Sequence, residues 1–309
     1  MKNILSDIIN CAGKPVDFAL ECEKEYHEEL LELARRIKKN DSIKIVMIAG
    51  PSASGKTTTA NILCGYLDTL GLKAKTVSLD NFYFDREKLP LLDTGEKDTE
   101  SINSLDVKEI TRCLTQVVNS GSTVMPYYDF TTGKSIKNKI PLDISDGGII
   151  VAEGLHALNP AITDALPQQS IYKIYISVSE EIYDTNGQKL LSSRKVRFVR
   201  RALRDKKFRN ADINVTLKMW PAVVQAEEKY LYPFKAKADK VLITLHSYEI
   251  CVYKREFLEM MKGADKNLAA YPYAAKIIPV MEKLPQIDES TVPYDSLLRE
   301  FLGGGKYSN

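Results

Sequence analysis

The eight residues at positions 50–57, GPSASGKT, fit the pattern GxxxxGK[ST]. Glycines at these places let successive backbone N–H groups curl around phosphate oxygens. Lys56 is expected to reach the β- and γ-phosphates of a nucleoside triphosphate, and the Thr57 hydroxyl to bind Mg²⁺. A chance glycine-rich turn is the alternative, but an apolar run precedes the motif and a helical pattern follows it. The expected ATP contacts in this loop are Gly50, Ser52, Ala53, Ser54, Gly55, Lys56, Thr57 and Thr58.

Two carboxylates follow apolar runs that are typical of buried strands. Asp80 lies in SLDNFYF at residues 78–84, and Glu153 follows GGIIVA at residues 147–152. Side chains just past the carboxyl ends of parallel strands point into the ligand crevice. We therefore interpret Asp80 as the general base that takes the proton of an attacking hydroxyl, with a helix cap or a role beside Mg²⁺ as alternatives. Glu153 is expected to bind Mg²⁺ through water or to orient Asp80, so the predicted metal-site residues are Thr57, Glu153 and Asp80.

Aromatic residues near these carboxylates suggest an acceptor pocket. Tyr83 follows Asp80, and MPYYDF at residues 125–130 supplies Tyr128, Asp129 and Phe130. Aromatic faces with one carboxylate suit a planar, hydroxylated ligand such as a nucleoside. The alternative is a turn broken by proline and surrounded by core aromatics. His156 is also predicted to touch the acceptor, although a lone histidine is more often structural.

Residues 194–209 hold most of the excess positive charge. The whole chain has a formal net charge of +2, but nine Lys or Arg and one Asp give this segment +8 and leave the remainder at −6. At helical spacing Arg197, Arg200, Arg201 and Arg204 share one face. Guanidinium groups so placed repel one another unless an anion lies between them, and a triphosphate is such an anion.

We therefore predict that residues 194–209 form a lid helix over nucleotide phosphates. Arg201 and Arg204 are expected to act with Lys56 and Asp80 in catalysis by stabilising the charge of the transferred group. Arg200 is expected to contact ATP and Arg197 the acceptor. A nucleic-acid-binding helix and a solvated basic face are the two alternatives, and a phosphate-binding loop in the same chain makes nucleic acid the less favoured partner.

Buried strands that alternate with helices must position these residues. Apolar runs at 43–49, 74–79, 147–152, 171–177 and 240–245 predict strands, and the segments 57–70, 105–119, 195–208 and 213–230 predict helices. This alternation favours an α/β fold with a mostly parallel five-stranded sheet flanked by helices. We expect a helical N-terminal extension (1–42), a core with the lid helix (43–248) and a helical C-terminal extension packed on the core (249–309).

The composition bears on membrane association and on the cellular compartment. No apolar run among the 309 residues approaches the roughly 18 that a membrane span needs. Five scattered cysteines with no CxxC pair favour a reducing compartment, so we predict a cytoplasmic protein without a membrane partner. The composition is compatible with either a monomer or a homo-oligomer.

In their order along the chain, GPSASGKTT, SLDNFYF, YYDF, IIVAEGLHALNP and RFVRRALRD resemble the uridine kinase/phosphoribulokinase group of P-loop kinases. MWPAVVQAEEKYLYPFKAKAD (219–239) and VPYDSLLREFLGGG (292–305) resemble the branch whose uridine-kinase-like domain often follows a threonyl-tRNA-synthetase-like region. The resemblance covers residues 25–305. It implies a P-loop kinase fold and Mg·ATP-dependent phosphoryl transfer to a 5′-type hydroxyl of a nucleoside. It also implies Asp80 as base and Arg201 and Arg204 as lid arginines.

The acceptor side departs from this pattern. Uridine kinases carry a base-contacting histidine shortly after YDF, whereas TTGK follows here at residues 131–134. Uridine or cytidine is therefore one candidate acceptor, and another small alcohol, such as a sugar phosphate, a polyol or a pantothenate-like compound, is the alternative. A nucleotide-binding, RNA-interacting regulator with little catalysis is the alternative from another class.

Overall fold

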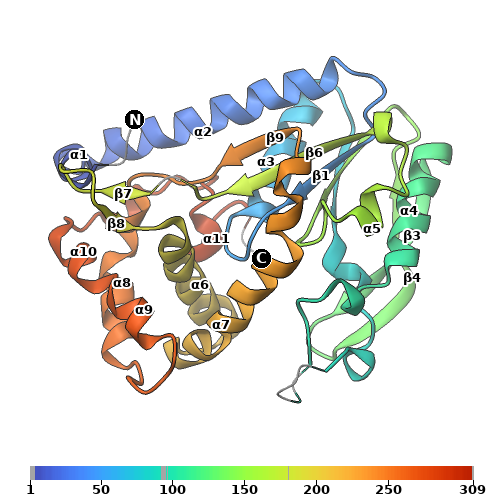
Figure 1. Cartoon of the computed structure of the whole chain (residues 1–309). Coiled ribbons are helices and arrows are strands. Elements are labelled where there is room, and N and C mark those ends of the chain that lie inside the picture. Colours follow the sequence, from blue (N-terminus) through green and yellow to red (C-terminus); the bar gives the residue numbers. More distant parts are fainter. Residues whose placement is uncertain (1–3, 92–94, 96, 180, 308–309) are drawn as a thin grey trace.

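The computed structural model describes residues 4–91, 95, 97–179 and 181–307. Its central sheet has five strands in the order β2-β5-β1-β6-β9, all parallel to their neighbours (Figure 1). The predicted five-stranded parallel sheet is confirmed. Its strands are β1 (Ile45–Ala49), β2 (Ala74–Ser78), β5 (Ile149–Glu153), β6 (Ile171–Ser177) and β9 (Lys240–Ile243).

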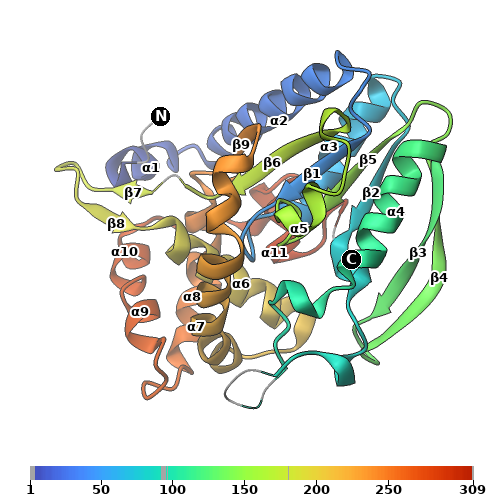
Figure 2. The ribbon, with the colours of Figure 1, turned by 45° about the vertical axis from the view of Figure 1, so that its right-hand side comes forward.

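Both faces of the sheet are covered, because side chains of β1 alternate between two hydrophobic clusters. Val46 and Ile48 belong to the cluster that includes α2 (Pro15–Lys38), α3 (Lys56–Thr69), α6 (Ser193–Arg209) and α8 (Glu249–Lys262). Ile45 and Met47 face α4 (Val107–Ser120), α5 (Pro160–Thr163) and the hairpin of β3 (Ser122–Asp129) and β4 (Lys134–Asp143) (Figure 2).

The two terminal parts of the chain share the first cluster. Leu30 of α2, Phe257 of α8 and Phe301 of α11 (Arg299–Leu302) are all buried in it. Burial of side chains this large stabilises by about 2–3 kcal/mol each, so neither end is an appendage. The other helices of the terminal parts are α1 (Leu5–Cys11), α9 (Tyr271–Ala275) and α10 (Ile278–Lys283).

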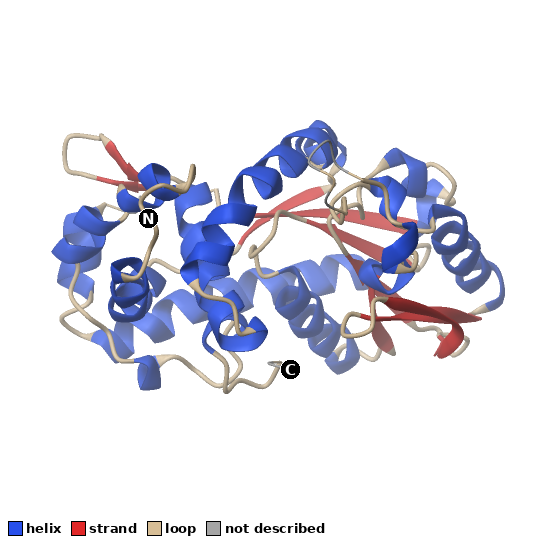
Figure 3. Cartoon of the chain, turned by 90° about the horizontal axis from the view of Figure 1, so that it is seen from below, coloured by secondary structure: helices blue, strands red, loops and turns tan. Residues whose placement is uncertain are grey.

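Two antiparallel hairpins extend from opposite ends of the molecule (Figure 3). The first is β3–β4, where a register shift between Met125 and Tyr127 accommodates Pro126, which cannot donate a backbone hydrogen bond. The second is β7 (Ile182–Tyr183) with β8 (Lys189–Leu191). The sequence patterns predicted neither hairpin, because proline and short length obscured them.

The predicted basic helix is present as α6, and it is packed rather than free along most of its length. Val196, Phe198, Val199 and Leu203 are fully or almost fully buried against the neighbouring α7 (Ile213–Tyr230), α8 and α11. None of the helices formed by the described residues is long and apolar enough to cross a membrane. The remaining short helical turns are η1 (Leu79–Phe82), η2 (Arg86–Lys88), η3 (Ile102–Ser104), η4 (Gln168–Ser170), η5 (Tyr232–Lys237) and η6 (Glu289–Thr291).

Candidate active site

The loop between β1 and α3 has the shape of a phosphate cradle. Ala53 (φ 57°) and Gly55 (φ 87°) both adopt the left-handed conformation, which turns backbone N–H groups inward. A side chain on Gly50 would come within 2.8 Å of Ser54 Oγ, so this position requires glycine. The buried Ser54 hydroxyl has no hydrogen-bond partner, and Lys56 Nζ donates to the Pro51 carbonyl at 3.1 Å. A loop with unpaired polar groups and a lysine folded over it fits a phosphate chain.

The two threonines at the start of α3 differ in their surroundings. Thr57, the predicted Mg²⁺ ligand, is exposed. Thr58 is 1% exposed, and its hydroxyl donates to Glu300 Oε2 at 2.7 Å while its backbone N–H donates to the same oxygen at 3.3 Å. The predicted phosphate contact at Thr58 is therefore engaged by a carboxylate from the C-terminal part of the chain.

Strand register brings the two predicted carboxylates to one edge of the sheet. Glu153 at the end of β5 pairs with Ile48 of β1 on one side and Ser78 of β2 on the other. Asp80 follows Ser78, whose hydroxyl accepts the Asp80 N–H. Both carboxylates thus lie beside the start of the phosphate loop, as the crevice rule for parallel sheets predicts.

Burial makes the negative charge of this pair unfavourable. Together with the nearby charge of Asp80, it raises the pKa of Glu153 to about 7, while Lys56 opposes the rise. Burial likewise raises the pKa of Asp80 against the lowering effects of Lys56 and Arg209. These two desolvated carboxylates and the exposed Thr57 hydroxyl all lie at or beyond the ends of strands of the parallel sheet, and they are oxygen donors of the kind that Mg²⁺ prefers. Within the described residues no group of three or more His, Cys, Asp or Glu side chains could by itself hold a metal.

Arg201 contacts the phosphate loop through its side chain, and Arg204 shares the same carboxylate partner. Arg201 Nη1 donates to Ser52 Oγ at 2.7 Å, and Arg201 Nε lies 3.2 Å from Asp205 Oδ2. Arg204 Nη2 lies 3.1 Å from the same carboxylate's other oxygen. Asp205 thus holds both guanidinium groups near the loop.

Arg197 and Arg200, the other two predicted arginines, are both buried and paired with carboxylates of the chain. Arg197 is 2% exposed and forms two parallel hydrogen bonds to Glu227, at 2.5 and 2.6 Å, while its Nη1 also donates to the Ser52 carbonyl. Arg200 is fully buried and forms the same two-pronged pair with Glu249, at 2.6 and 2.8 Å. A carboxylate of the chain neutralises each of these two arginines, so the acceptor contact of Arg197 and the ATP contact of Arg200 stay predictions.

Arg209 is a candidate that the sequence reasoning missed. It ends α6, lies 3.3 Å from Asp205 Oδ1, and acts on the pKa of Asp80 through its positive charge. Burial and the neighbouring Arg204 lower its own pKa. Its place one helical turn after Asp205 was the signal that could have found it.

The predicted acceptor aromatics do assemble into one cluster. The ring centroids of Tyr128 and Phe130 are 4.9 Å apart and those of Tyr83 and Tyr128 are 5.3 Å apart. Phe130 is 59% exposed and Tyr83 is half-buried, so the cluster presents ring surface to solvent. Asp129 instead stabilises the hairpin turn, because its Oδ1 accepts the backbone N–H groups of Thr131 and Thr132. The Thr132 hydroxyl and these backbone N–H groups lower the pKa of Asp129.

His156 pairs with the backbone of Glu100, a residue that carries a further carboxylate. It is 4% exposed, its Nε2 pairs with the Glu100 carbonyl at 2.9 Å, and burial lowers its pKa to about 4. His156 therefore supports the backbone at Glu100, and its contact with the acceptor stays a prediction. Burial and the charge of Asp80 raise the pKa of the Glu100 carboxyl, whereas Arg201 and Lys56 lower it. Glu100 is thus a second candidate that the sequence reasoning missed, and it lies in the same electrostatic environment as Asp80.

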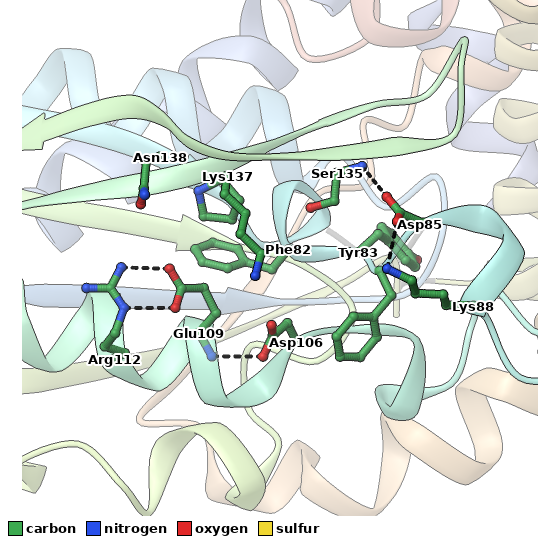
Figure 4. A pocket seen from close by; sticks show the side chains of 12 residues that line it. Phe82, Tyr83, Asp85, Lys88, Asp106, Glu109, Arg112, Ser135, Lys137 and Asn138 are labelled. Atoms are coloured by element: carbon green, nitrogen blue, oxygen red, sulfur yellow. Dashed lines mark hydrogen bonds and ion pairs between the residues drawn. The ribbon is translucent and has the colours of Figure 1, made fainter.

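A polar cavity of about 480 Å³ lies between η1, α4 and the β3–β4 hairpin (Figure 4). Its charged walls are largely paired, since Arg112 binds both oxygens of Glu109 and Lys88 binds Asp85. Of the predicted acceptor residues only Tyr83 lines it, and neither the phosphate loop nor α6 contributes. The cavity is therefore adjacent to the candidate acceptor site and separate from the phosphate side.

The chain is similar to known proteins in sequence and in structure. The model of the Phosphoribulokinase / Uridine kinase family matches residues 45–250. A uridine kinase of Staphylococcus epidermidis is 26% identical over 199 residues, which cover 64% of this chain and 86% of that protein. Uridine kinase-like protein 5 of Arabidopsis thaliana is 26% identical over 200 residues, but the chain spans only 38% of its length. A Bacillus stearothermophilus structure described as a possible uridine kinase is 23% identical, covers 65% of this chain and 88% of that one, and has a TM-score of 0.42.

Proposed function

Because the chain belongs to the Phosphoribulokinase / Uridine kinase family, we propose that it transfers the γ-phosphate of ATP to a hydroxyl of a small molecule, most favourably a nucleoside. The observation that supports this proposal is the position of the Asp80 carboxyl beside the phosphate loop. The positive charges of Lys56 and Arg209 both act on its pKa there. A base, a phosphate-binding cation and a charge-stabilising arginine at one edge are what hydroxyl-to-phosphate transfer needs.

In this proposal the residues divide the work by position. The backbone N–H groups of the loop and Lys56 bind the phosphates, and Arg201, Arg204 and Arg209 offset the negative charge that spreads over the transferred group. Asp80 accepts the proton of the attacking hydroxyl, and its raised pKa favours that step. Mg²⁺, when bound, supplies charge neutralisation for the phosphates. Thr57, Glu153 and Asp80 would hold it.

A nucleoside is favoured by what lies beside Asp80. The partly exposed rings of Tyr83 and Phe130 offer stacking surface for a flat base. Glu100 offers a carboxylate that accepts hydrogen bonds from hydroxyl groups, and the charge of Asp80 is one of the causes that raise its pKa, after burial. A site that stacks on a flat ring and binds hydroxyl groups beside it suits a nucleoside better than a polyol.

The test is an acceptor screen with purified protein, Mg²⁺ and ATP against nucleosides, sugars, sugar phosphates, polyols and pantothenate. We expect a nucleoside to raise ADP formation, and Asp80→Asn to reduce kcat by about 10²- to 10⁴-fold, the range that general bases contribute. Asp129→Asn is the matched control, because that carboxylate stabilises a turn in the same cluster. ADP formation that no acceptor raises above background would refute the kinase proposal. A sugar or polyol as sole acceptor would refute the nucleoside.

A further inference from the structure

The C-terminal segment, defined here as residues 292–305, covers the phosphate loop. Leu297 is fully buried, and a side chain carbon on Gly55 would lie 2.5 Å from its Cδ1. The same segment contains α11, which packs on α6, and the backbone at Gly303 lies close to the side chains of Lys207 and Phe208. The segment therefore bridges the phosphate loop and the end of the arginine helix.

Glu300 in this segment binds a donor that phosphates use. The backbone N–H groups at the start of the helix after a phosphate loop are the donors for nucleotide phosphate oxygens. Thr58, the third residue of α3, gives both its N–H and its hydroxyl to Glu300 Oε2, at 3.3 and 2.7 Å. A carboxylate oxygen has the charge and the acceptor capacity of a phosphate oxygen, so Glu300 occupies the place of one.

The charge of Glu300 also adds to the negative field of the site. It contributes to the raised pKa of the Glu153 carboxyl, together with Asp80. A nucleotide that arrived with its own phosphates would meet this third carboxylate at the same edge. Electrostatic repulsion then favours the departure of Glu300 when phosphates occupy the loop.

The segment is held in a way that permits this departure. Arg299 donates to the carbonyls of Val292, Pro293 and Gly303, so the fold of the segment depends on internal hydrogen bonds. Ser296 ties it to Glu23 of α2. Glu300 can leave Thr58 while these anchors remain.

We propose that Glu300 is an internal competitor of the nucleotide. In the free protein its carboxylate holds the Thr58 donors. A nucleoside diphosphate or triphosphate displaces it, and the C-terminal segment passes this displacement to α6. The inference rests on the proposed function in one respect, because it requires that nucleotide phosphates bind this loop.

Calorimetric titration of the full chain with ADP and with adenosine tests this competition. Because Glu300→Gln keeps the shape but removes the charge, we expect it to bind ADP about fivefold more tightly than the natural chain, with adenosine affinity unchanged. Glu289→Gln is the matched control: Glu289 pairs with Arg299 in the neighbouring turn, and no hydrogen bond joins its side chain to α3 among the described residues. ADP affinity that is unchanged or weaker in Glu300→Gln would overturn the proposal and leave Glu300 a structural cap of α3.

Hydrogen exchange on the natural chain supplies a second measurement that does not depend on the variant's folding. Saturating ADP should accelerate amide exchange in α11, because the segment loses its hydrogen bonds to Thr58. Slower or unchanged exchange there would contradict the displacement. A natural chain that binds no ADP at all would refute the proposed function itself, and this inference with it.

Discussion

Glu153→Gln should make the protein more stable at neutral and alkaline pH while it damages activity. The change replaces a carboxylate that is 7% exposed with an amide of the same shape. Burial and the charge of Asp80 raise the pKa of Glu153 from 4.5 to about 7. A shift of this size corresponds to about 3 kcal/mol, since one pKa unit is worth about 1.4 kcal/mol. Glutamine removes that cost because it is never charged.

The pH dependence fixes the sign of this effect. Below pH 4.5 the carboxyl is protonated in both the folded and the unfolded chain, so the substitution changes little. As the pH rises, the unfolded chain loses this proton first, and the natural protein loses stability until the folded pKa of about 7 is passed. The gain in the free energy of unfolding should therefore be about 1 kcal/mol at pH 5 and about 3 kcal/mol at pH 8.

Urea denaturation in EDTA at pH 5 and pH 8 measures this difference without Mg²⁺. Glu28→Gln is the control, because the Glu28 side chain is 67% exposed on α2, and its effect should stay within about 0.5 kcal/mol at both pH values. The gain should shrink in an Asp80→Asn background, since the charge of Asp80 causes part of the shift. A variant less stable than the natural chain at pH 8, or equally stabilised at both pH values, would refute this reasoning.

Two further predictions concern the arginine helix. Glu227→Gln should lower the free energy of unfolding by about 3 kcal/mol in urea denaturation, because it leaves the buried Arg197 without its charged partner; a loss below about 0.5 kcal/mol would show that the pair is dispensable. Arg201→Lys should reduce kcat at least about tenfold in the acceptor assay while ADP still binds, because lysine lacks the planar fork that reaches Ser52. An unchanged kcat would place Arg201 outside the reacting centre.

The sheet and the phosphate loop were predictable because their signals are local. Apolar runs of six or seven residues marked the strands, and the exact bounds of β6 and α7 match the predicted ranges 171–177 and 213–230. The β3–β4 hairpin was not predicted, since Pro126 suggested a break where the strand contains a bulge. A proline within a strand is compatible with pairing at such an irregularity, so tertiary packing decided what local propensity could not.

The partners of the site residues were harder to predict because they come from distant positions. Glu227 is 30 residues from Arg197, and Glu300 is 242 residues from Thr58. The spacing of the arginines on one helix face showed that anions must lie between them, but it could not say whether those anions belong to a ligand or to the chain itself. For Arg197 and Arg200 the chain supplies them.

This division gives α6 two kinds of arginine with different consequences. Arg197 and Arg200 each form a buried ion pair with a carboxylate. Breaking either pair would leave an unpaired buried charge, which costs several kcal/mol. Arg201, Arg204 and Arg209 share the single carboxylate of Asp205, so three positive charges meet one negative charge. These three arginines lie at the end of the helix that approaches Asp80, and the charges of Asp80 and Glu100 act on Arg209 and Arg201. In the part of the chain that the structure describes, none of the three is enclosed in a two-pronged pair with one carboxylate, so they can turn to an arriving phosphate chain while Arg197 and Arg200 keep the helix in place.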